Sequence, residues 1–193
     1  MKYNEIRPHL KTLDIALFSG KGRISEGIKF GTMSRWSHVG LIVVVPDVGV
    51  LLAESTTLSN IPDVLTGDHI RGVQLVNFSM RIDSYNGDIG IRHLTGFDRT
   101  DCLSKLKEIR QELHGRPYEK SRWSLIKSAY DGPGGRNTED LQSIFCSEFV
   151  AYVYKRFVLL NDRKPSSEYT PANFSKLSPS PPAQLGPIIE LSR

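Results

Sequence analysis

The chain of 193 residues has few of the features that mark several large protein classes. It contains only two cysteines, Cys102 and Cys146, too few for a disulfide-stabilised scaffold, and we interpret both as thiols. Its longest apolar run, residues 39–45, is far below the ~20 residues that a membrane-spanning helix needs. The first eight residues lack the apolar core of a signal peptide. These absences predict a cytoplasmic protein with no export signal and no transmembrane segment.

Positive and negative side chains are also nearly balanced in number. The chain carries 25 Lys and Arg against 21 Asp and Glu, and the basic residues form no dense block. The net charge of +4 favours weak contact with anionic surfaces but predicts no specific nucleic-acid partner. Without internal repeats, and with enough residues for one core, residues 1–193 are expected to form a single domain. Residues 178–193 begin rich in proline and are expected to form a C-terminal strap.

Short apolar segments bounded by Gly or Pro-Asp predict a sheet. An Asn86-Gly87 pair favours a tight hairpin between the last two segments. The expected strands cover residues 14–18, 37–45, 50–55, 70–78, 80–84 and 88–94.

Helical patterns follow in the second half of the chain, over residues 101–114, 121–130 and 144–160. In the first of these helices, Cys102 falls on the apolar face and is expected to pack in the core. The last helix carries a clear apolar stripe that begins at Cys146. Strands followed by helices predict an α+β fold in which this stripe packs on a mostly antiparallel sheet.

Cys146 is the candidate nucleophile. The predicted helix places it in the first turn, where free backbone N–H groups and the helix dipole favour a thiolate and would stabilise an oxyanion. The alternative is that Cys146 is an apolar residue at the top of the stripe.

His38 is the candidate base, because it begins a strand whose other residues are almost all apolar. A hydrogen-bonded histidine at a strand end is the alternative, and His93 is the competing base. Glu54 ends the next apolar strand and is the candidate group for orienting His38, with Thr56 as a substitute. A three-residue loop after Val45, with a left-handed Gly49, would place His38 and Glu54 on one face without making them direct neighbours.

The order of these elements resembles the circularly permuted branch of the NlpC-like and papain-like superfamily, the YiiX/YebB-like group, with lecithin:retinol acyltransferase as a more distant relative. In this branch the histidine strand precedes the cysteine helix. Each motif is short, and together they span most of the chain. The matching motifs are Asp14–Phe18, Trp36–Gly40, Ala53–Ser55, Phe145–Val150 and Tyr169–Pro171.

The resemblance implies a permuted papain-like fold and the roles already assigned to Cys146, His38 and Glu54. It also implies that Tyr118 lines the substrate cleft, and we assign Ser37 and Ser147, which neighbour the catalytic positions, to substrate binding. Tyr118 as an ordinary turn aromatic is the alternative. Neither a metal nor another cofactor is expected.

The expected function is a cysteine hydrolase that attacks a peptide-like amide, such as a cell-wall peptide, through a thioester acyl-enzyme. Two alternatives remain open. One is a lipid acyltransferase or phospholipase of the same fold. The other is a non-catalytic module that binds a peptide or an anion.

Overall fold

The computed structural model describes residues 1–21, 25, 29, 32–56, 58–113 and 141–192, with the backbone alone for residues 141–145. A six-stranded sheet in the order β4-β3-β2-β1-β5-β8 forms the centre of the fold, and all its neighbouring strands pair antiparallel. Its strands are β1 (Ile15–Gly20), β2 (His38–Val45), β3 (Gly49–Thr56), β4 (Gly72–Asn77), β5 (Gly87–Arg92) and β8 (Ile189–Glu190). The short strands β6 (Leu94–Thr95) and β7 (Gln184–Leu185) pair separately.

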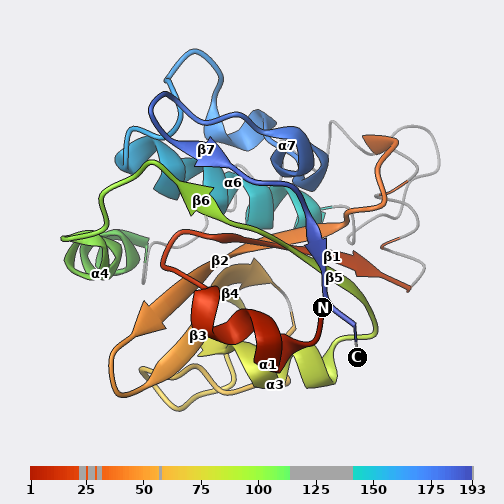
Figure 1. The fold of residues 1–193 in the computed structure, drawn as a ribbon. Coiled ribbons are helices and arrows are strands. Elements are labelled where there is room, and N and C mark those ends of the chain that lie inside the picture. Colours follow the sequence, from red (N-terminus) through yellow and green to blue (C-terminus); the bar gives the residue numbers. More distant parts are fainter. Residues whose placement is uncertain (22–24, 26–28, 30–31, 57, 114–140, 193) are drawn as a thin grey trace.

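Helices cover both faces of the sheet (Figure 1). On one side lie α6 (Leu141–Arg156) and α7 (Pro171–Lys176), and on the other lie α1 (Tyr3–Ile6) and α3 (Phe78–Ser84). A further helix, α4 (Cys102–Leu113), lies beside the sheet, and the 3₁₀ turns among the described residues are η1 (Arg7–His9) and η2 (Ser166–Glu168). The α+β class and the mostly antiparallel sheet predicted from the sequence are confirmed.

The two faces of the sheet bury separate apolar clusters, because successive side chains of a strand point to opposite sides. In β2, Val39 and Leu41 pack with the stripe of α6, including Phe149 and Val153. Ile42 instead joins the cluster under α1 and α3, which contains Phe78. Cys102 is buried in the first cluster, as predicted.

The β2–β3 hairpin has the predicted register. Val45 pairs with Gly49 and Leu41 with Ala53, so residues 46–48 form a three-residue loop. Gly49 has a φ of 114°, and Asp47 is also left-handed with a φ of 62°. This register places His38 and Glu54 on the same face of the sheet.

Residues 80–84 are not a strand, contrary to the prediction. The side chain of Asn77 accepts hydrogen bonds from the backbone N–H groups of Ser79 and Met80 and thereby begins helix α3. Asn86-Gly87 therefore makes no hairpin between two strands, and β5 pairs with β1 and β8 instead. The expected helix over residues 121–130 lies outside the described residues.

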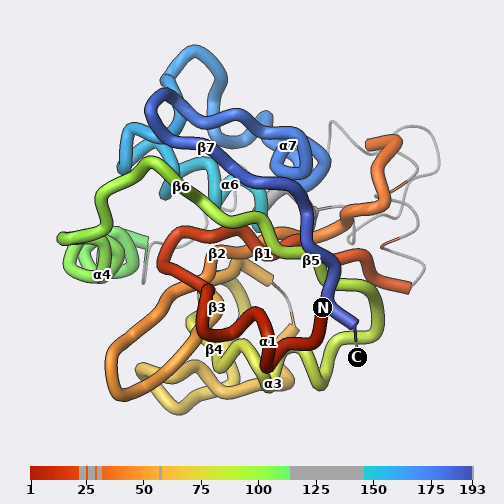
Figure 2. Tube along the Cα trace, viewed as in Figure 1, coloured from red at the N-terminus to blue at the C-terminus, as the bar shows by residue number. Residues whose placement is uncertain are grey.

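The C-terminal segment does more than strap the surface, because it contributes β7 and β8 to the two sheets. It also brings the two ends of the chain side by side (Figure 2), where Met1 donates its N-terminal ammonium to the carbonyl of Glu190 at 3.1 Å. Within the described ranges, no helix is both long enough and apolar enough to cross a lipid bilayer.

Candidate functional site

His38 and Glu54 are in direct contact. His38 is the first residue of β2, and its Nε2 lies 2.7 Å from Oε2 of Glu54. The Glu54 side chain is only 1% exposed. Gly40 leaves room for this contact, because a β-carbon there would come within 3.3 Å of the Glu54 β-carbon and 3.0 Å of the Ala53 carbonyl oxygen. The expectation that the two residues share a face without being direct neighbours in the register is confirmed.

Cys146 approaches His38 from the other layer. It belongs to α6 and is fully buried in the apolar cluster on that side of the sheet. A side-chain hydrogen bond joins it to His38. Because Glu54 occupies Nε2 of the imidazole, Nδ1 is the ring nitrogen left for Cys146.

The charges of this site reinforce one another. Burial lowers the pKa of His38, but hydrogen bonds and charge interactions with Cys146 and Glu54 outweigh it and raise the pKa from 6.5 to about 10. Burial likewise opposes ionisation of Glu54, yet the hydrogen bonds and charges of His38 and Arg81 lower its pKa. The site therefore favours an imidazolium next to a carboxylate at neutral pH.

The position of Cys146 within its helix differs from the prediction. α6 begins at Leu141, so Cys146 is the sixth helical residue and lies beyond the first turn. The four N–H groups without helical acceptors belong to the start of a helix. Cys146 therefore does not offer its own N–H as a free oxyanion donor.

Two residues that the sequence analysis missed hold the opposite oxygen of Glu54. Arg81 Nε lies 2.9 Å from Oε1, with Nη2 at 2.7 Å from the same atom, and Gln74 donates its amide to it at 3.1 Å. Arg81 is on α3 and Gln74 on β4, directly opposite Glu54 in the strand register. Gln74 was detectable as a polar residue in an apolar strand, whereas Arg81 was hidden in a segment predicted to be a strand.

Tyr85 is a further residue missed by sequence reasoning. Its ring packs edge-on against Phe18, with the ring centres 5.0 Å apart, and Phe18 in turn lies 5.3 Å from the His38 ring. Burial raises the pKa of Tyr85 to about 12, with a hydrogen bond to Ser37 opposing this and the charges of Cys146 and Glu54 adding to it. The hydroxyl therefore remains protonated at neutral pH, and the Tyr85 ring packs against the apolar cluster under α1 and α3.

The other predicted site residues lie as follows. Ser37 is buried, donating to the Phe18 carbonyl at 3.3 Å and accepting from the Gly20 N–H at 3.2 Å. Ser147 is fully buried and donates to the Tyr169 carbonyl at 2.6 Å. Their roles in substrate binding stay predictions, and Tyr118 lies outside the described residues.

Thr56, the substitute for Glu54, has a different task. Its hydroxyl accepts from the backbone N–H of Leu58 at 3.1 Å. Glu54 is therefore the group that holds His38.

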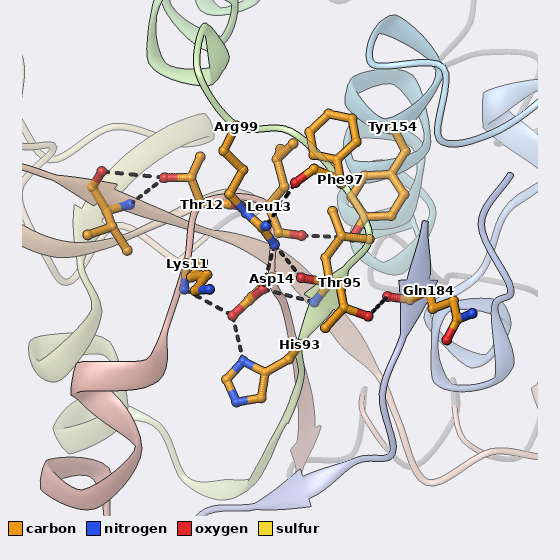
Figure 3. Close-up of polar contacts among 12 residues, drawn as sticks. Lys11, Thr12, Leu13, Asp14, His93, Thr95, Phe97, Arg99, Tyr154 and Gln184 are labelled. Carbon is orange, nitrogen blue, oxygen red and sulfur yellow. Dashed lines mark hydrogen bonds and ion pairs between the residues drawn. The ribbon is translucent and has the colours of Figure 1, made fainter. Parts of the chain in front are cut away.

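His93, the competing base, belongs to a separate polar cluster (Figure 3). Its Nδ1 lies 2.7 Å from the fully buried carboxylate of Asp14, which also accepts from the backbone N–H groups of Lys11 and Leu94. Arg99 contacts the same carboxylate at 3.5 Å. Asp14 thus links the start of β1 to the end of β5, and His93 is one of its hydrogen-bond partners.

The chain matches no protein-family model and no curated protein. Among solved structures it is similar to the metalloprotein YiiX from Escherichia coli O157:H7, with 20% sequence identity and a TM-score of 0.50. The similarity covers 78% of this chain and 67% of YiiX. It shows a YiiX-like α+β fold, and YiiX is the protein after which the group suggested by the sequence motifs is named.

The description of YiiX as a metalloprotein raises the question of whether this chain holds a metal. In the part of the chain that the structure describes, no three His, Cys, Asp or Glu side chains are grouped as a metal site would require. Both oxygens of Glu54 are already occupied, by His38 and by Arg81 with Gln74. The described residues therefore do not fit a metal at this site.

Proposed function

We propose that the protein is a thiol-dependent hydrolase of the permuted papain-like class, with Cys146 as nucleophile, His38 as base and Glu54 as the group that orients His38. The observation that carries the proposal is that one imidazole interacts with both partners, with Glu54 at Nε2 and with Cys146 through a side-chain hydrogen bond. A base held between a nucleophile and an orienting carboxylate is the arrangement that nucleophilic catalysis requires.

In the proposed reaction, Cys146 transfers its proton to His38, and the thiolate attacks the carbonyl carbon of an amide. The C–N bond breaks as His38 returns the proton to the departing nitrogen, leaving an acyl group on the sulfur as a thioester. His38 then removes a proton from water, the resulting hydroxide attacks the thioester carbonyl, and the Cys146 sulfur leaves. Glu54 keeps Nε2 protonated throughout, so that Nδ1 is available to exchange protons with Cys146.

Peptide-like amides are the proposed substrates, because the proton on His38 is needed to release an amine, a poor leaving group. The similarity to YiiX supports the fold in which this site sits and leaves the substrate open. Fatty-acyl esters, the substrates of the alternative lipid enzyme, provide a direct comparison in the same assay.

The test is capture of the acyl-enzyme. The protein is incubated with a mixed library of peptide amides and lipid esters, quenched in acid, and digested for mass analysis of the peptide that contains Cys146. An acyl adduct on Cys146, absent from Cys146→Ala and unchanged in Cys102→Ala, is the expected result. Adducts from lipid esters alone would favour the acyltransferase, and a chain that never acylates would favour the non-catalytic binding module.

A further inference from the structure

Arg81 occupies an unusual position for an arginine. Its side chain is 1% exposed, on the inner side of α3, and contacts Oε1 of Glu54 through two nitrogens. The third nitrogen, Nη1, donates to the side-chain oxygen of Asn60 at 3.0 Å. A guanidinium is removed from water at a large free-energy cost, and for Arg81 the buried carboxylate of Glu54 compensates this cost.

Glu54 divides its two oxygens between two tasks. Oε2 faces His38, and among the described residues Oε1 faces the donors of Arg81 and Gln74. The amide of Gln74 is oriented by two acceptors, Oε1 of Glu54 and the Leu58 carbonyl, while its own oxygen has no hydrogen-bond partner among the described residues. The Gln74 amide is therefore oriented to donate to Oε1 of Glu54, although its own oxygen is left without a hydrogen bond among the described residues.

We propose that Arg81 is a positioning residue of the site, which keeps Glu54 ionised and turned toward His38 and thereby allows Cys146 to lose its proton to His38. This inference rests on the proposed function. A Cys146 thiolate, a His38 imidazolium and the Glu54 carboxylate together carry one negative charge. The guanidinium of Arg81 balances this charge, so the four buried groups have no net charge. Without it, one anion is uncompensated, and the least costly response is protonation of Glu54 or of the Cys146 sulfur.

The groups that face Glu54 determine the direction of the effect. They are His38 and Arg81 in direct contact and Gln74 as a neutral donor, with the protonated Tyr85 nearby and Cys146 acting on His38. Arg81 is the only permanent cation among these residues, so its loss disfavours both anions. The pH above which Cys146 becomes reactive must then rise.

The experiment measures alkylation of Cys146 by iodoacetamide in the full chain from about pH 4 to about pH 9, read by mass. The acid limb of the profile is the pH range over which the alkylation rate rises as Cys146 loses its proton. Opening of the buried site changes the rate by the same factor at every pH, so the position of this limb on the pH axis depends on ionisation alone. Arg81→Met should move this limb to higher pH and lower the rate at a given acidic pH by about tenfold, the equivalent of one pH unit. Arg81→Lys, which keeps the charge, should recover most of the rate.

Arg92→Met is the matched control. Arg92 is also buried, but it donates to the backbone carbonyls of Phe174, Leu177, Leu185 and Gly186, away from Glu54. This variant should lower thermal stability and leave the acid limb in place. A folded Arg81→Met protein with the wild-type limb, or an equal displacement in Arg92→Met, would overturn the proposal.

If Arg81→Met does not fold, the double variant Arg81→Met with Glu54→Gln removes both buried charges and tests the same point. Its acid limb should coincide with that of Glu54→Gln alone, and a further displacement would contradict an action through Glu54. The wild-type profile separates the two proposals. A wild-type Cys146 without enhanced reactivity at neutral pH removes the proposed function and this inference with it, whereas an enhanced Cys146 indifferent to Arg81 removes only the inference.

Discussion

Replacement of Glu54 by Gln should impair the site more than its similar shape suggests. The donors of Arg81 and Gln74 both face Oε1, so the single amide oxygen of the new side chain is expected to take that position. Its NH₂ group then points at Nε2 of His38 and can only donate. His38 must accept at Nε2 and carry its proton on Nδ1, where it can no longer receive the proton of Cys146.

The size of the effect follows from ionisation. A cysteine without a base has a pKa near 8.5 and is roughly 3% thiolate at pH 7, so the alkylation rate of Cys146 should fall about thirtyfold in Glu54→Gln. Turnover should fall further, by about 10⁴, the effect of an amide in place of the orienting carboxylate of a hydrolase triad. Glu54→Ala leaves His38 free to change tautomer, so it should retain more reactivity than Glu54→Gln.

Stability should follow the opposite order. Glu54→Gln keeps a hydrogen bond from Arg81 but loses the charged contact with His38, so it should cost about 1.5–3 kcal/mol, the contribution of a hydrogen bond to a charged group. Glu54→Ala leaves the buried guanidinium without its anionic partner and should cost about 3–5 kcal/mol. Glu112→Gln is the matched control, because Glu112 accepts from Arg156 at a half-exposed position away from the site. Chemical denaturation and iodoacetamide kinetics measure the two effects. Wild-type reactivity in Glu54→Gln would refute the tautomer argument.

Three further predictions use the same assays. In the native chain, Cys146 should react with iodoacetamide at least tenfold faster than Cys102, whose pKa is raised by burial, and equal rates would contradict the assignment of Cys146. His38→Ala should lower turnover by about 10²–10⁴. His93→Ala should leave turnover in place and cost only about 1–3 kcal/mol of stability, because it loses the bond to the buried Asp14 carboxylate. The reverse pattern would identify His93 as the base. Gly40→Ala should destabilise the fold by about 1–3 kcal/mol and displace the neighbouring carboxylate, so unchanged unfolding would show that the strand adjusts.

The contact between His38 and Glu54 could be predicted because strand alternation and one turn determine it. A loop of three residues after Val45 sets which side chains share a face, and Gly49 identified that loop. The apolar stripe of α6 was equally legible, since it repeats with the helical period. Both features depend on residues close in sequence, where few alternatives compete.

Arg81 and the start of α6 were missed because their cause is not in the pattern itself. Residues 80–84 alternate polar and apolar in a way that suits a strand, and the capping side chain of Asn77 decides for a helix. The contribution of β7 and β8 likewise depends on distant partners, β6 and β5, that no local signal identifies. At β7 and β8, tertiary pairing decides what local preference leaves open.

The site lies where the two layers of the fold meet at the beginning of β2. Alternation along the strand places His38 with Glu54 and Arg81 on the α3 side, while its neighbour Val39 packs into the cluster of α6, which carries Cys146. A displacement of the strand relative to either layer would therefore separate the base from one of its two partners. The register of β2 and β3 fixes the carboxylate, and the packing of α6 on Val39 fixes the sulfur. The chemistry proposed for this chain therefore depends on the first residues of β2, which hold the base in contact with the carboxylate and with the sulfur.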